Sequence, residues 1–450
     1  MTFDPPVSLW PDPEALGPVT DLYQLTMMAG YAAEGMDRAR ATFELFVRRL
    51  PPGRSFLIFA GLEQAVGDLL RLAFTREQAE AIRLLPAFDG VDPDFFDKLP
   101  DLRFEGDLWA IPEGTVVFAG EPLLRVQALL PEAQWVETIL LASLGYPTLV
   151  ASKAARVVEA AAGRPVYDFG ARRGHGPHAG LLAARAAYLG GCAGTSHVEA
   201  ARRLGIPCVG TMAHSWVQSF DSEAESFAAY ARTFPGATTL LVDTYDVEGG
   251  VLAAARIEPA VQAVRIDSGD LEKLARRTRS ILDAHDRGAT KILGSGDLDE
   301  HSIGALVAAG APFDAFGVGT ELITSRDAPA LSMVYKLVEL DGAGRVKLSP
   351  GKKTYPLAKQ VFRQYDSRGR FEYDRVTGAD ETAEGVPLLK AVIRNGILQG
   401  PLPRIDDIRS YCRQQILGLP VPFLNREDAP SFPIVYSDLL EDEAARLGVR

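Results

Sequence analysis

The residues best suited to chemistry in this chain lie at positions 264–271, in the sequence VRIDSGDL. Apolar, β-branched residues lead into this stretch and a helical pattern follows it, which predicts a buried strand, a polar turn and a helix. Junctions of this kind bind ligand phosphates in α/β proteins. Arg265 supplies a forked cation, while Asp267 and Asp270 supply carboxylates for sugar hydroxyls or Mg²⁺. The alternative is a solvated loop in which Asp270 only caps the helix.

Residues 165–320 repeat this order of an apolar run followed by a helical segment. Strands that alternate with helices predict a parallel sheet. Seven repeats in succession favour a β/α barrel, with an open doubly wound sheet as the alternative. The seven runs are PVYDF, CAGTS, PCVGTM, TTLLVDT, VQAVRID, TKILGS and DAFGVG.

Polar residues follow nearly every predicted strand. In a barrel these positions share the C-terminal face, where active sites form. Any one set could be a helix cap, but seven sets on one rim predict an active site. The sets are Asp168, Arg172 and Arg173; Thr195, Ser196 and His197; Thr211, His214 and Ser215; Asp243, Thr244 and Asp246; Arg265, Asp267 and Asp270; Ser295, Gly296 and Asp297; Gly317, Gly319 and Thr320.

Two glycine-containing turns, GSGD (294–297) and GVGT (317–320), end the last two predicted strands. Glycine lets backbone N–H groups approach an anion, and the last two loops of a barrel commonly bind phosphate. Standard nucleotide motifs do not match: SPGKKT (349–354) lacks the spacing of a P-loop, and GHGPHAG (174–180) lacks that of a dinucleotide fingerprint. His214, in GTMAHSWVQSF, is either a structural histidine or a nucleophile and proton carrier on the rim.

Composition limits the class of protein. The chain has 450 residues, 47% of them hydrophobic, which suffices for two or three packed domains. A net charge of −12 argues against a nucleic-acid or anionic membrane surface. Three cysteines without metal-type spacing predict free thiols in a reducing cytoplasm. We find no signal-peptide pattern and no apolar run of membrane-spanning length.

Three regions are predicted: a mixed α/β region at 1–150, the β/α barrel with the active site at 151–330, and a β-rich, then helical, region at 331–450. The last region contains two hairpin patterns, at 332–349 and 360–376. Between them GKKTYPLAK carries Lys352, Lys353 and Lys359. We expect the two flanking regions to pack together.

The chain resembles nicotinate phosphoribosyltransferases. The resemblance is carried, in the family's order, by TDLYQLTM, FELFVRRLP, DFGARRGHGP, GTSH, GTMAHSWVQSF, RIDSGDL, GSGDLDE, FGVGT and YKLVE. It implies an irregular, incomplete, seven-stranded β/α barrel with a flanking α/β domain, working as a homodimer. It also implies NAD biosynthesis by pyridine nucleotide salvage, in the cytoplasm.

The implied reaction joins nicotinate to phosphoribosyl pyrophosphate, with Mg²⁺ and with ATP as a co-substrate, in the manner of a ligase. The resemblance assigns the substrate carboxylate to Arg265 and ribose or Mg²⁺ to Asp267, directly or through water. It makes His214 the residue that ATP phosphorylates, and no zinc is expected. Further substrate contacts fall on Tyr23 of the partner subunit, Phe169, Arg172, Ser196, Thr211, Gly296, Asp297, Gly319, Thr320, Arg326 and Lys336.

Ser196 separates this chain from nicotinamide-specific relatives, which resemble GTSH but carry an acid at this position. An acid would repel the carboxylate of nicotinate, whereas a serine can donate to it. Two other enzymes remain as alternatives, a quinolinate or a nicotinamide phosphoribosyltransferase. A non-catalytic phosphosugar-binding dimer is the alternative from a different class.

Overall fold

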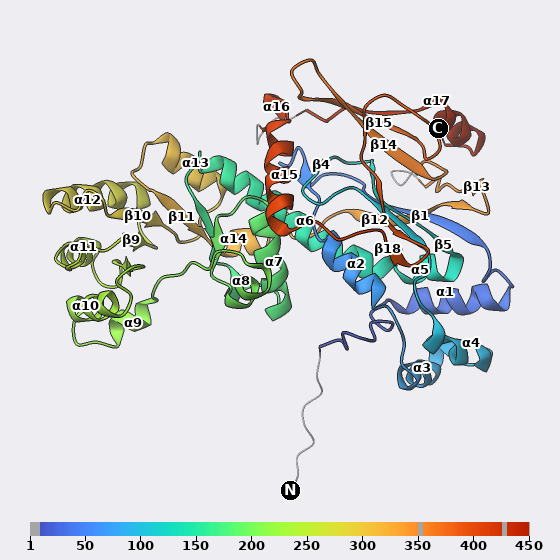
Figure 1. Cartoon of the computed structure of the whole chain (residues 1–450), viewed down its shortest axis with the longest axis horizontal. Coiled ribbons are helices and arrows are strands. Elements are labelled where there is room, and N and C mark those ends of the chain that lie inside the picture. The colour runs from blue at the N-terminus through green and yellow to red at the C-terminus, as the bar shows by residue number, and fades with distance from the viewer. Residues whose placement is uncertain (1–9, 350–353, 425–429, 450) are drawn as a thin grey trace, which may run out of the picture. The chain divides into compact units, whose positions relative to one another are not determined.

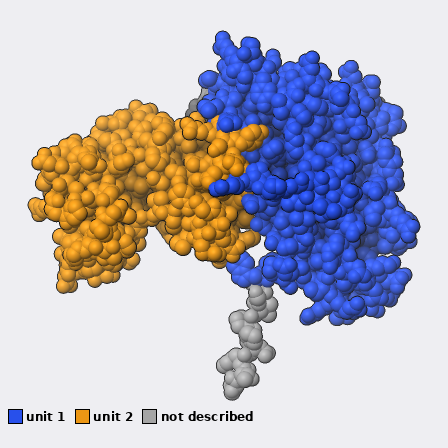
Figure 2. Space-filling view, in the orientation of Figure 1, with its two compact units in different colours: residues 1–146, 330–404, 414–450 blue, residues 147–329, 405–413 orange. Residues whose placement is uncertain are grey.

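The computed structural model describes residues 10–349, 354–424 and 430–449. The chain divides into two compact units, which Figure 2 colours separately. Unit 1 comprises residues 1–146, 330–404 and 414–450, and unit 2 comprises residues 147–329 and 405–413. Two helices contribute to both units, α6 (Glu137–Ala160) and α15 (Ile405–Leu417).

Unit 2 is built around a parallel sheet of six strands in the order β7-β6-β11-β10-β9-β8. Figure 1 labels three of them, β9, β10 and β11. The first strand of the unit, β6, pairs with its last strand, β11, as in a barrel. Strands β7 and β8 are the two edges, so the sheet does not close. It curls into a half-barrel. The predicted parallel sheet is confirmed. Its strands are β6 (Val166–Asp168), β7 (Gly194–Thr195), β8 (Thr239–Leu241), β9 (Ala263–Ile266), β10 (Lys291–Gly294) and β11 (Ala315–Val318).

The predicted strand at 207–212 is reduced to an isolated parallel bridge between Thr195 and Cys208. Two hydrogen bonds form it, from Thr195 N to the Pro207 carbonyl (3.0 Å) and from Val209 N to the Thr195 carbonyl (2.9 Å). Because proline has no N–H to donate, the ladder cannot extend on that side. The seven predicted strands are therefore six strands and one bridge.

Helices separate the strands of unit 2, as the sequence predicts. Several begin at a side-chain cap: Asp246 accepts from Gly249 N and Asp270 from Lys273 N. Asp270 therefore caps α12 and Asp246 caps α11. The helices are η3 (Ala171–Arg173), α7 (Pro177–Leu189), α8 (Val198–Leu204), α9 (His214–Gln218), α10 (Glu223–Thr233), α11 (Val247–Ala255), α12 (Leu271–Ala284), α13 (Glu300–Ala308) and α14 (Thr320–Ile323).

Unit 1 contains a seven-stranded antiparallel sheet in the order β13-β12-β1-β5-β3-β17-β18. Its interior strand β1, between β12 and β5, is buried over most of its length, and the ring of Phe43 stacks on that of Tyr335 with centroids 4.8 Å apart. Many residues of this sheet belong to an extended cluster of buried hydrophobic side chains. Its strands are β1 (Arg40–Val47), β3 (Asp107–Ala110), β5 (Pro122–Leu129), β12 (Met333–Leu340), β13 (Ala343–Gly344), β17 (Lys390–Arg394) and β18 (Ile397–Leu398).

A second sheet in unit 1 has the order β16-β14-β15-β19, and β2 (Leu57–Ile58) pairs with β4 (Val116–Val117). Both predicted hairpins are present, as β12–β13 and β14–β15. Lys359 is buried in an ion pair with Glu44, whereas Lys352 and Lys353 lie outside the described residues. The strands are β14 (Lys359–Tyr365), β15 (Phe371–Gly378), β16 (Val386–Pro387) and β19 (Ile434–Tyr436).

The helices of unit 1 are short. Among the described residues, no helix of either unit is both long and apolar enough to cross a membrane. Those of unit 1 are α1 (Leu22–Ala33), α2 (Leu62–Leu70), α3 (Arg76–Arg83), η1 (Pro86–Phe88), α4 (Pro93–Lys98), η2 (Leu99–Asp101), α5 (Leu130–Trp135), α16 (Val421–Leu424) and α17 (Asp438–Arg446).

Candidate active site

Arg265 is a cation at the C-terminal edge of the parallel sheet, held there by several hydrogen bonds. Its side chain, 13% exposed, projects from β9. The guanidinium donates to the Ser295 hydroxyl (2.7 Å), the Thr211 hydroxyl (3.0 Å) and Oδ1 of Asp267 (2.5 Å). These partners follow three different predicted strands, so the structure brings together residues that the sequence placed on one rim.

Asp267 connects Arg265 to a second carboxylate. The Ser295 hydroxyl donates to Oδ1 of Asp267 (2.6 Å), and the backbone N–H of Asp267 donates to Oδ2 of Asp243 (3.0 Å). The Ser268 hydroxyl donates to the same Asp243 oxygen (2.6 Å). The other oxygen, Oδ1 of Asp243, is buried and has no hydrogen-bond partner in the described part of the chain. Two neighbouring carboxylates with one free buried oxygen suit a hard cation.

Phe169 presents an aromatic ring beside this cluster. It follows β6, and its backbone N–H donates to the Val318 carbonyl (2.8 Å). The ring covers Gly317 so closely that a Cβ there would lie 2.4 Å from it, so residue 317 must be glycine. The Arg265 guanidinium lies 5.5 Å from the ring centroid. Arg172, which is exposed, donates to the Phe169 carbonyl (3.3 Å).

Ser196 is fixed through its neighbour Asp168, a buried residue at the end of β6. Asp168 accepts hydrogen bonds from the Thr195 hydroxyl (2.7 Å) and from Gly170 N (2.8 Å), and its carbonyl accepts from Ser196 N (2.8 Å). Burial raises the pKa of Asp168, and the two hydrogen bonds to its carboxylate oppose that rise. The backbone of Ser196 is thus tied to the strand that carries Phe169.

The two glycine turns border these residues. Gly296 has a φ of +95°, and a Cβ there would lie 1.9 Å from the Asp267 carbonyl, so only glycine fits. Asp297 follows with a φ of +45°. In the second turn, a Cβ on Gly319 would contact the Phe169 carbonyl at 3.5 Å, and Thr320 begins α14. The first turn therefore abuts Asp267 and the second abuts Phe169.

His214 is the first residue of α9 and is half-buried. Its Nδ1 lies 3.1 Å from the Thr244 hydroxyl, in the loop between β8 and α11. In this loop Asp243, which belongs to the Asp243–Asp267 cluster, directly precedes Thr244. This hydrogen bond sets the orientation of the imidazole ring.

Glu223 is a candidate that the sequence analysis missed. Burial, and then the charges of Asp246 and Asp243, raise its pKa to about 7. Its Oε1 is buried without a hydrogen-bond partner among the described residues. In the sequence it only begins an ordinary helix after Ser222, which caps α10. No local signal in the sequence shows that Glu223 lies near Asp243 and Asp246, in the loop between β8 and α11.

Three further predicted residues are not members of this cluster. Arg326 belongs to unit 2, is 68% exposed and pairs with Glu321 (2.7 Å). Tyr23 and Lys336 belong to unit 1. Partial burial and a hydrogen bond to Glu137 raise the pKa of Tyr23. Burial lowers the pKa of Lys336, the Glu137 charge opposes the shift, and nearby cations reinforce it.

Family models cover most of the chain. Residues 19–145 match the nicotinate phosphoribosyltransferase N-terminal domain, and residues 165–360 match the nicotinate phosphoribosyltransferase family. The chain belongs to the nicotinate phosphoribosyltransferase family. The resemblance inferred from the motifs is thereby confirmed, and the matched ranges include all the predicted site residues.

Comparisons with individual members of the nicotinate phosphoribosyltransferase family support the same assignment. The chain is 47% identical over 436 residues to the nicotinate phosphoribosyltransferase pncB2 of Mycobacterium tuberculosis, covering 95% of this chain and 93% of that one. It is 36% identical over 460 residues to the Bacillus subtilis nicotinate phosphoribosyltransferase, covering 94% and 92%. The crystal structure of human nicotinic acid phosphoribosyltransferase matches with a TM-score of 0.85 at 29% identity, covering 95% of this chain and 99% of that one.

Proposed function

We propose that this protein joins nicotinate to phosphoribosyl pyrophosphate, forming nicotinate mononucleotide and pyrophosphate, with ATP hydrolysis coupled to the reaction. One observation carries the proposal: the guanidinium of Arg265 is held beside the ring of Phe169 at the sheet edge. A planar aromatic acid needs these two partners, a ring to stack on and a cation for its carboxylate. Family membership supports the same substrate.

Arg265 has the capacity to bind a carboxylate in addition to its protein partners. A guanidinium has five N–H donors. Three of them are used by Ser295, Thr211 and Asp267, one on each nitrogen. One donor therefore remains on each of the two terminal nitrogens. Two parallel donors match the two oxygens of the nicotinate carboxylate.

The chemistry requires positioning more than acid or base catalysis. The pyridine nitrogen of nicotinate is already nucleophilic, so no general base is needed. Positive charge develops at the ribosyl carbon as pyrophosphate leaves. The protein must therefore hold both reactants in line and stabilise the departing charge. Phe169, Arg265 and the two glycine turns supply such positioning groups.

Asp243 and Asp267 fit a Mg²⁺ ion that arrives with the pyrophosphate, either directly or through water. Mg²⁺ in nucleotide and phosphate sites is held by one or two carboxylates plus substrate phosphates. Oδ1 of Asp243 is buried and lacks a hydrogen-bond partner in the described residues, as a metal-binding oxygen would. Bound there, the ion would neutralise charge on the leaving group. We expect no zinc, because the three cysteines are free and widely spaced.

The turns at 294–297 and 317–320 are the proposed site for the 5′-phosphate. Gly296 lets its turn pack directly against the Asp267 carbonyl, and Gly319 places the second turn against the Phe169 carbonyl. Backbone N–H groups of such glycine turns can bind an anion. Asp297 and Thr320 extend these turns, and Arg326 and Lys336 are the proposed longer-range cations. Arg172 and Thr211 complete the substrate contacts.

Ser196 is the proposed determinant that favours an acid over an amide. Its backbone is held by the hydrogen bond from Ser196 N to the Asp168 carbonyl (2.8 Å). A neutral serine can donate to a carboxylate, whereas an acid would accept from the NH₂ of an amide and repel a carboxylate. We therefore expect nicotinate to be preferred over nicotinamide.

ATP is proposed to act through His214. A neutral imidazole is a competent nucleophile toward a phosphoryl group. The Thr244 hydroxyl orients the ring, and Asp243 lies in the same loop. A phosphohistidine would add negative charge near the proposed Mg²⁺ and pyrophosphate site. Its formation and hydrolysis could then change affinity for the reactants during each cycle.

We also propose a symmetric homodimer with shared active sites. Tyr23 and Lys336 belong to unit 1, whereas the Arg265 cluster lies entirely in unit 2. Helix α1 exposes Leu22, Tyr23 and Met27, an apolar surface that a partner subunit would cover.

The fold we propose is the incomplete seven-stranded barrel, with the bridge at Cys208 as its reduced strand. The flanking domain would come from the two terminal regions. NAD salvage in the cytoplasm is consistent with three free cysteines.

A product assay tests the proposal. Purified protein is incubated with phosphoribosyl pyrophosphate, Mg²⁺ and one of three acceptors, with and without ATP. We expect nicotinate mononucleotide and pyrophosphate from nicotinate, and faster turnover with ATP. Preference for quinolinate without an ATP effect would favour the quinolinate enzyme, and preference for nicotinamide would overturn the role of Ser196. Binding of phosphoribosyl pyrophosphate without formation of any product would favour the alternative of a non-catalytic phosphosugar-binding dimer.

A further inference from the structure

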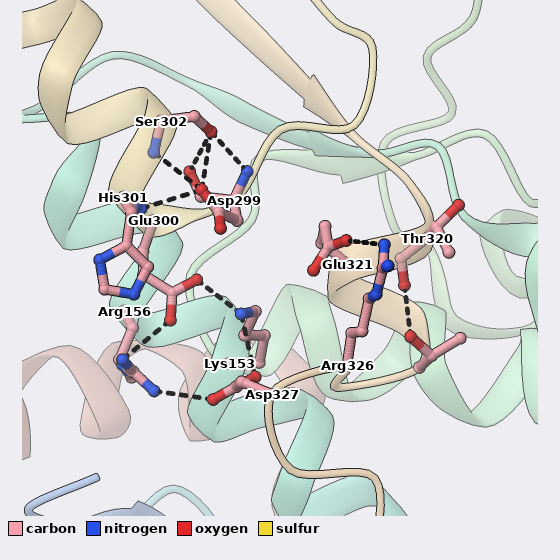
Figure 3. A network of polar contacts seen from close by, with 11 residues as sticks. Lys153, Arg156, Asp299, Glu300, His301, Ser302, Thr320, Glu321, Arg326 and Asp327 are labelled. Carbon is pink, nitrogen blue, oxygen red and sulfur yellow. Dashed lines mark hydrogen bonds and ion pairs between the residues drawn. The ribbon is translucent and has the colours of Figure 1, made fainter. Parts of the chain in front are cut away.

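Four charged side chains form a closed ion-pair cluster in unit 2 (Figure 3). Lys153 and Arg156 lie one turn apart on α6. Nζ of Lys153 contacts Oε2 of Glu300 (2.6 Å) and Oδ1 of Asp327 (2.9 Å). The Arg156 guanidinium contacts Oε1 of Glu300 (2.9 Å) and Oδ2 of Asp327 (3.0 Å). Each cation therefore holds both acids, and each acid holds both cations.

The two acids belong to the two segments that carry the glycine turns. Glu300 is the first residue of α13, three residues beyond Asp297. Asp327 follows α14, which begins at Thr320. Figure 3 shows both segments converging on the side chains from α6. Helix α6 thus fixes the end of one turn relative to the end of the other.

The local backbone keeps both acids directed toward α6. Asp299 caps α13 and forms a reciprocal capping box with Ser302, which fixes the position where Glu300 begins the helix. After α14, Ser325 adopts a φ of +43°, and Ala328 N donates to its carbonyl (2.7 Å). This turn encloses Asp327. The neighbouring Arg326 points elsewhere and pairs with Glu321.

Burial makes the cluster rigid. The side chains of Lys153 and Glu300 are 2% and 0% exposed. An unpaired charge at such depth is strongly unfavourable, so each member depends on its partners. A buried ion pair rarely adds stability over apolar side chains of similar size, but it permits few arrangements. The main effect of the cluster is therefore geometric, because it fixes the spacing between the two segments.

We propose that Lys153, Arg156, Glu300 and Asp327 form a positioning cluster that sets the distance between the two glycine turns, and so determines the affinity for the 5′-phosphate of phosphoribosyl pyrophosphate. None of the four touches the substrate. The inference rests on the proposed function, because it takes the turns at 294–297 and 317–320 as the phosphate site. Phosphate binding to two turns requires their N–H groups to converge on one point, so a small change in spacing weakens all contacts together.

The test compares Asp327→Asn with a matched control. Asp327 is the most exposed of the four at 30%, so its variant is the one expected to fold. The control, Asp374→Asn, breaks the Arg363–Asp374 ion pair (2.6 Å), which is fully buried in the β14–β15 sheet of unit 1. We expect Asp327→Asn to raise the KM for phosphoribosyl pyrophosphate at least fivefold. The KM for nicotinate and kcat should stay within twofold. The control should lower the melting temperature without that selective rise in KM.

Arg156 supplies a second pair of variants. Arg156→Gln removes one cation and should reproduce the selective rise in KM, whereas Arg156→Lys keeps the charge and should restore most of the affinity. Direct titration with ribose 5-phosphate, the simplest ligand with a 5′-phosphate, should show the same order. An equal rise of both KM values, or no rise in either variant, would overturn the positioning role.

The wild-type protein distinguishes this inference from the proposed function. If it binds neither phosphoribosyl pyrophosphate nor ribose 5-phosphate, both proposals fail. If it binds both ligands and Asp327→Asn binds them equally well, the function stands and only the positioning cluster is excluded.

Discussion

Arg265 and Asp267 form an ion pair with 2.5 Å between a terminal guanidinium nitrogen and Oδ1. The residues are two apart at the end of β9, so their side chains point to the same side of the sheet. Ser295 bonds to both partners and completes a triangle. Each residue therefore orients the other, and the proposed carboxylate site at Arg265 is adjacent to the proposed Mg²⁺ site at Asp267.

Loss of Arg265 should weaken nicotinate binding. In Arg265→Ala the substrate carboxylate would meet no cation, at a cost of about 2–5 kcal/mol. The KM for nicotinate should rise at least about tenfold. Because Asp267 also loses its partner, affinity for Mg²⁺-phosphoribosyl pyrophosphate should change as well, by a smaller factor. Steady-state kinetics with each substrate varied in turn will measure both effects.

Two variants serve as controls for Arg265. Arg265→Lys retains the charge but not the fork, so its KM should lie between the wild-type and alanine values. Arg202→Ala removes an arginine that is 66% exposed and that pairs, among the described residues, with Glu199 on α8 alone, and it should change neither KM. An unchanged KM for nicotinate in Arg265→Ala would remove Arg265 from the site.

The predicted dimer can be tested by complementation. Tyr23→Ala and Asp267→Ala chains are each expected to be inactive. If Tyr23 reaches the partner's site, a mixed dimer of these chains has one intact site, and activity should return on subunit exchange. Activity of the mixture, with exchange confirmed by mass spectrometry, is the measurement.

The matching control places both substitutions on one chain. A dimer of that chain with wild type has no intact shared site, so subunit exchange should lower the activity per wild-type chain. Failure of the two single variants to restore activity after confirmed exchange would show that each chain is complete alone.

Glu223 should make the stability of the protein depend on pH. Burial and two neighbouring acids raise its pKa to about 7, well above the usual value of 4.5. Between these values the folded protein holds a proton that the unfolded chain releases. Stability from Glu223 is therefore fully present below about pH 4.5 and is lost as pH rises through 7. Glu223→Gln should flatten this decline, as measured by urea unfolding from pH 4.5 to 8.

Glu225→Gln provides the comparison for Glu223. Glu225 lies two residues further along α10 and is exposed. Its substitution should leave the pH profile as in the wild type. A profile that is equally steep in Glu223→Gln and in the wild type would show that another group is responsible.

Much of unit 2 could be predicted because its signals are local. Short β-branched runs that end in glycine or polar turns identified β6 through β11, and the same turns identified the rim around Arg265 and Asp267. The segment at 207–212 has an equally good strand pattern. Whether it extends a ladder depends on its neighbour and on Pro207, and that dependence is not local.

Other features arise from contacts between distant parts of the chain. The hairpin at β12 was predicted, but its main partner is β1, and the Phe43–Tyr335 stack joins segments far apart in sequence. The sequence placed Ser295 on the rim, but not as the bridge between Arg265 and Asp267. Lys153 is the clearest missed signal, because a lysine within an apolar helical stretch must either reach solvent or find acids.

The last prediction concerns energy coupling through His214. His214→Ala should abolish ATP hydrolysis and acid-labile labelling of the protein by γ-labelled ATP, because the phosphoryl acceptor is gone. It should retain slow, ATP-independent transfer, since Arg265, Asp267 and the glycine turns still bind the reactants. Thr244→Val keeps the imidazole but removes the hydroxyl 3.1 Å from Nδ1. Loss of that hydrogen bond, worth about 1 kcal/mol, should slow labelling roughly fivefold without abolishing it. Peptide mapping of the labelled protein identifies the modified residue. Label at a residue other than His214, or full ATP hydrolysis in His214→Ala, would exclude this coupling mechanism and leave the phosphoribosyl transfer itself unaffected.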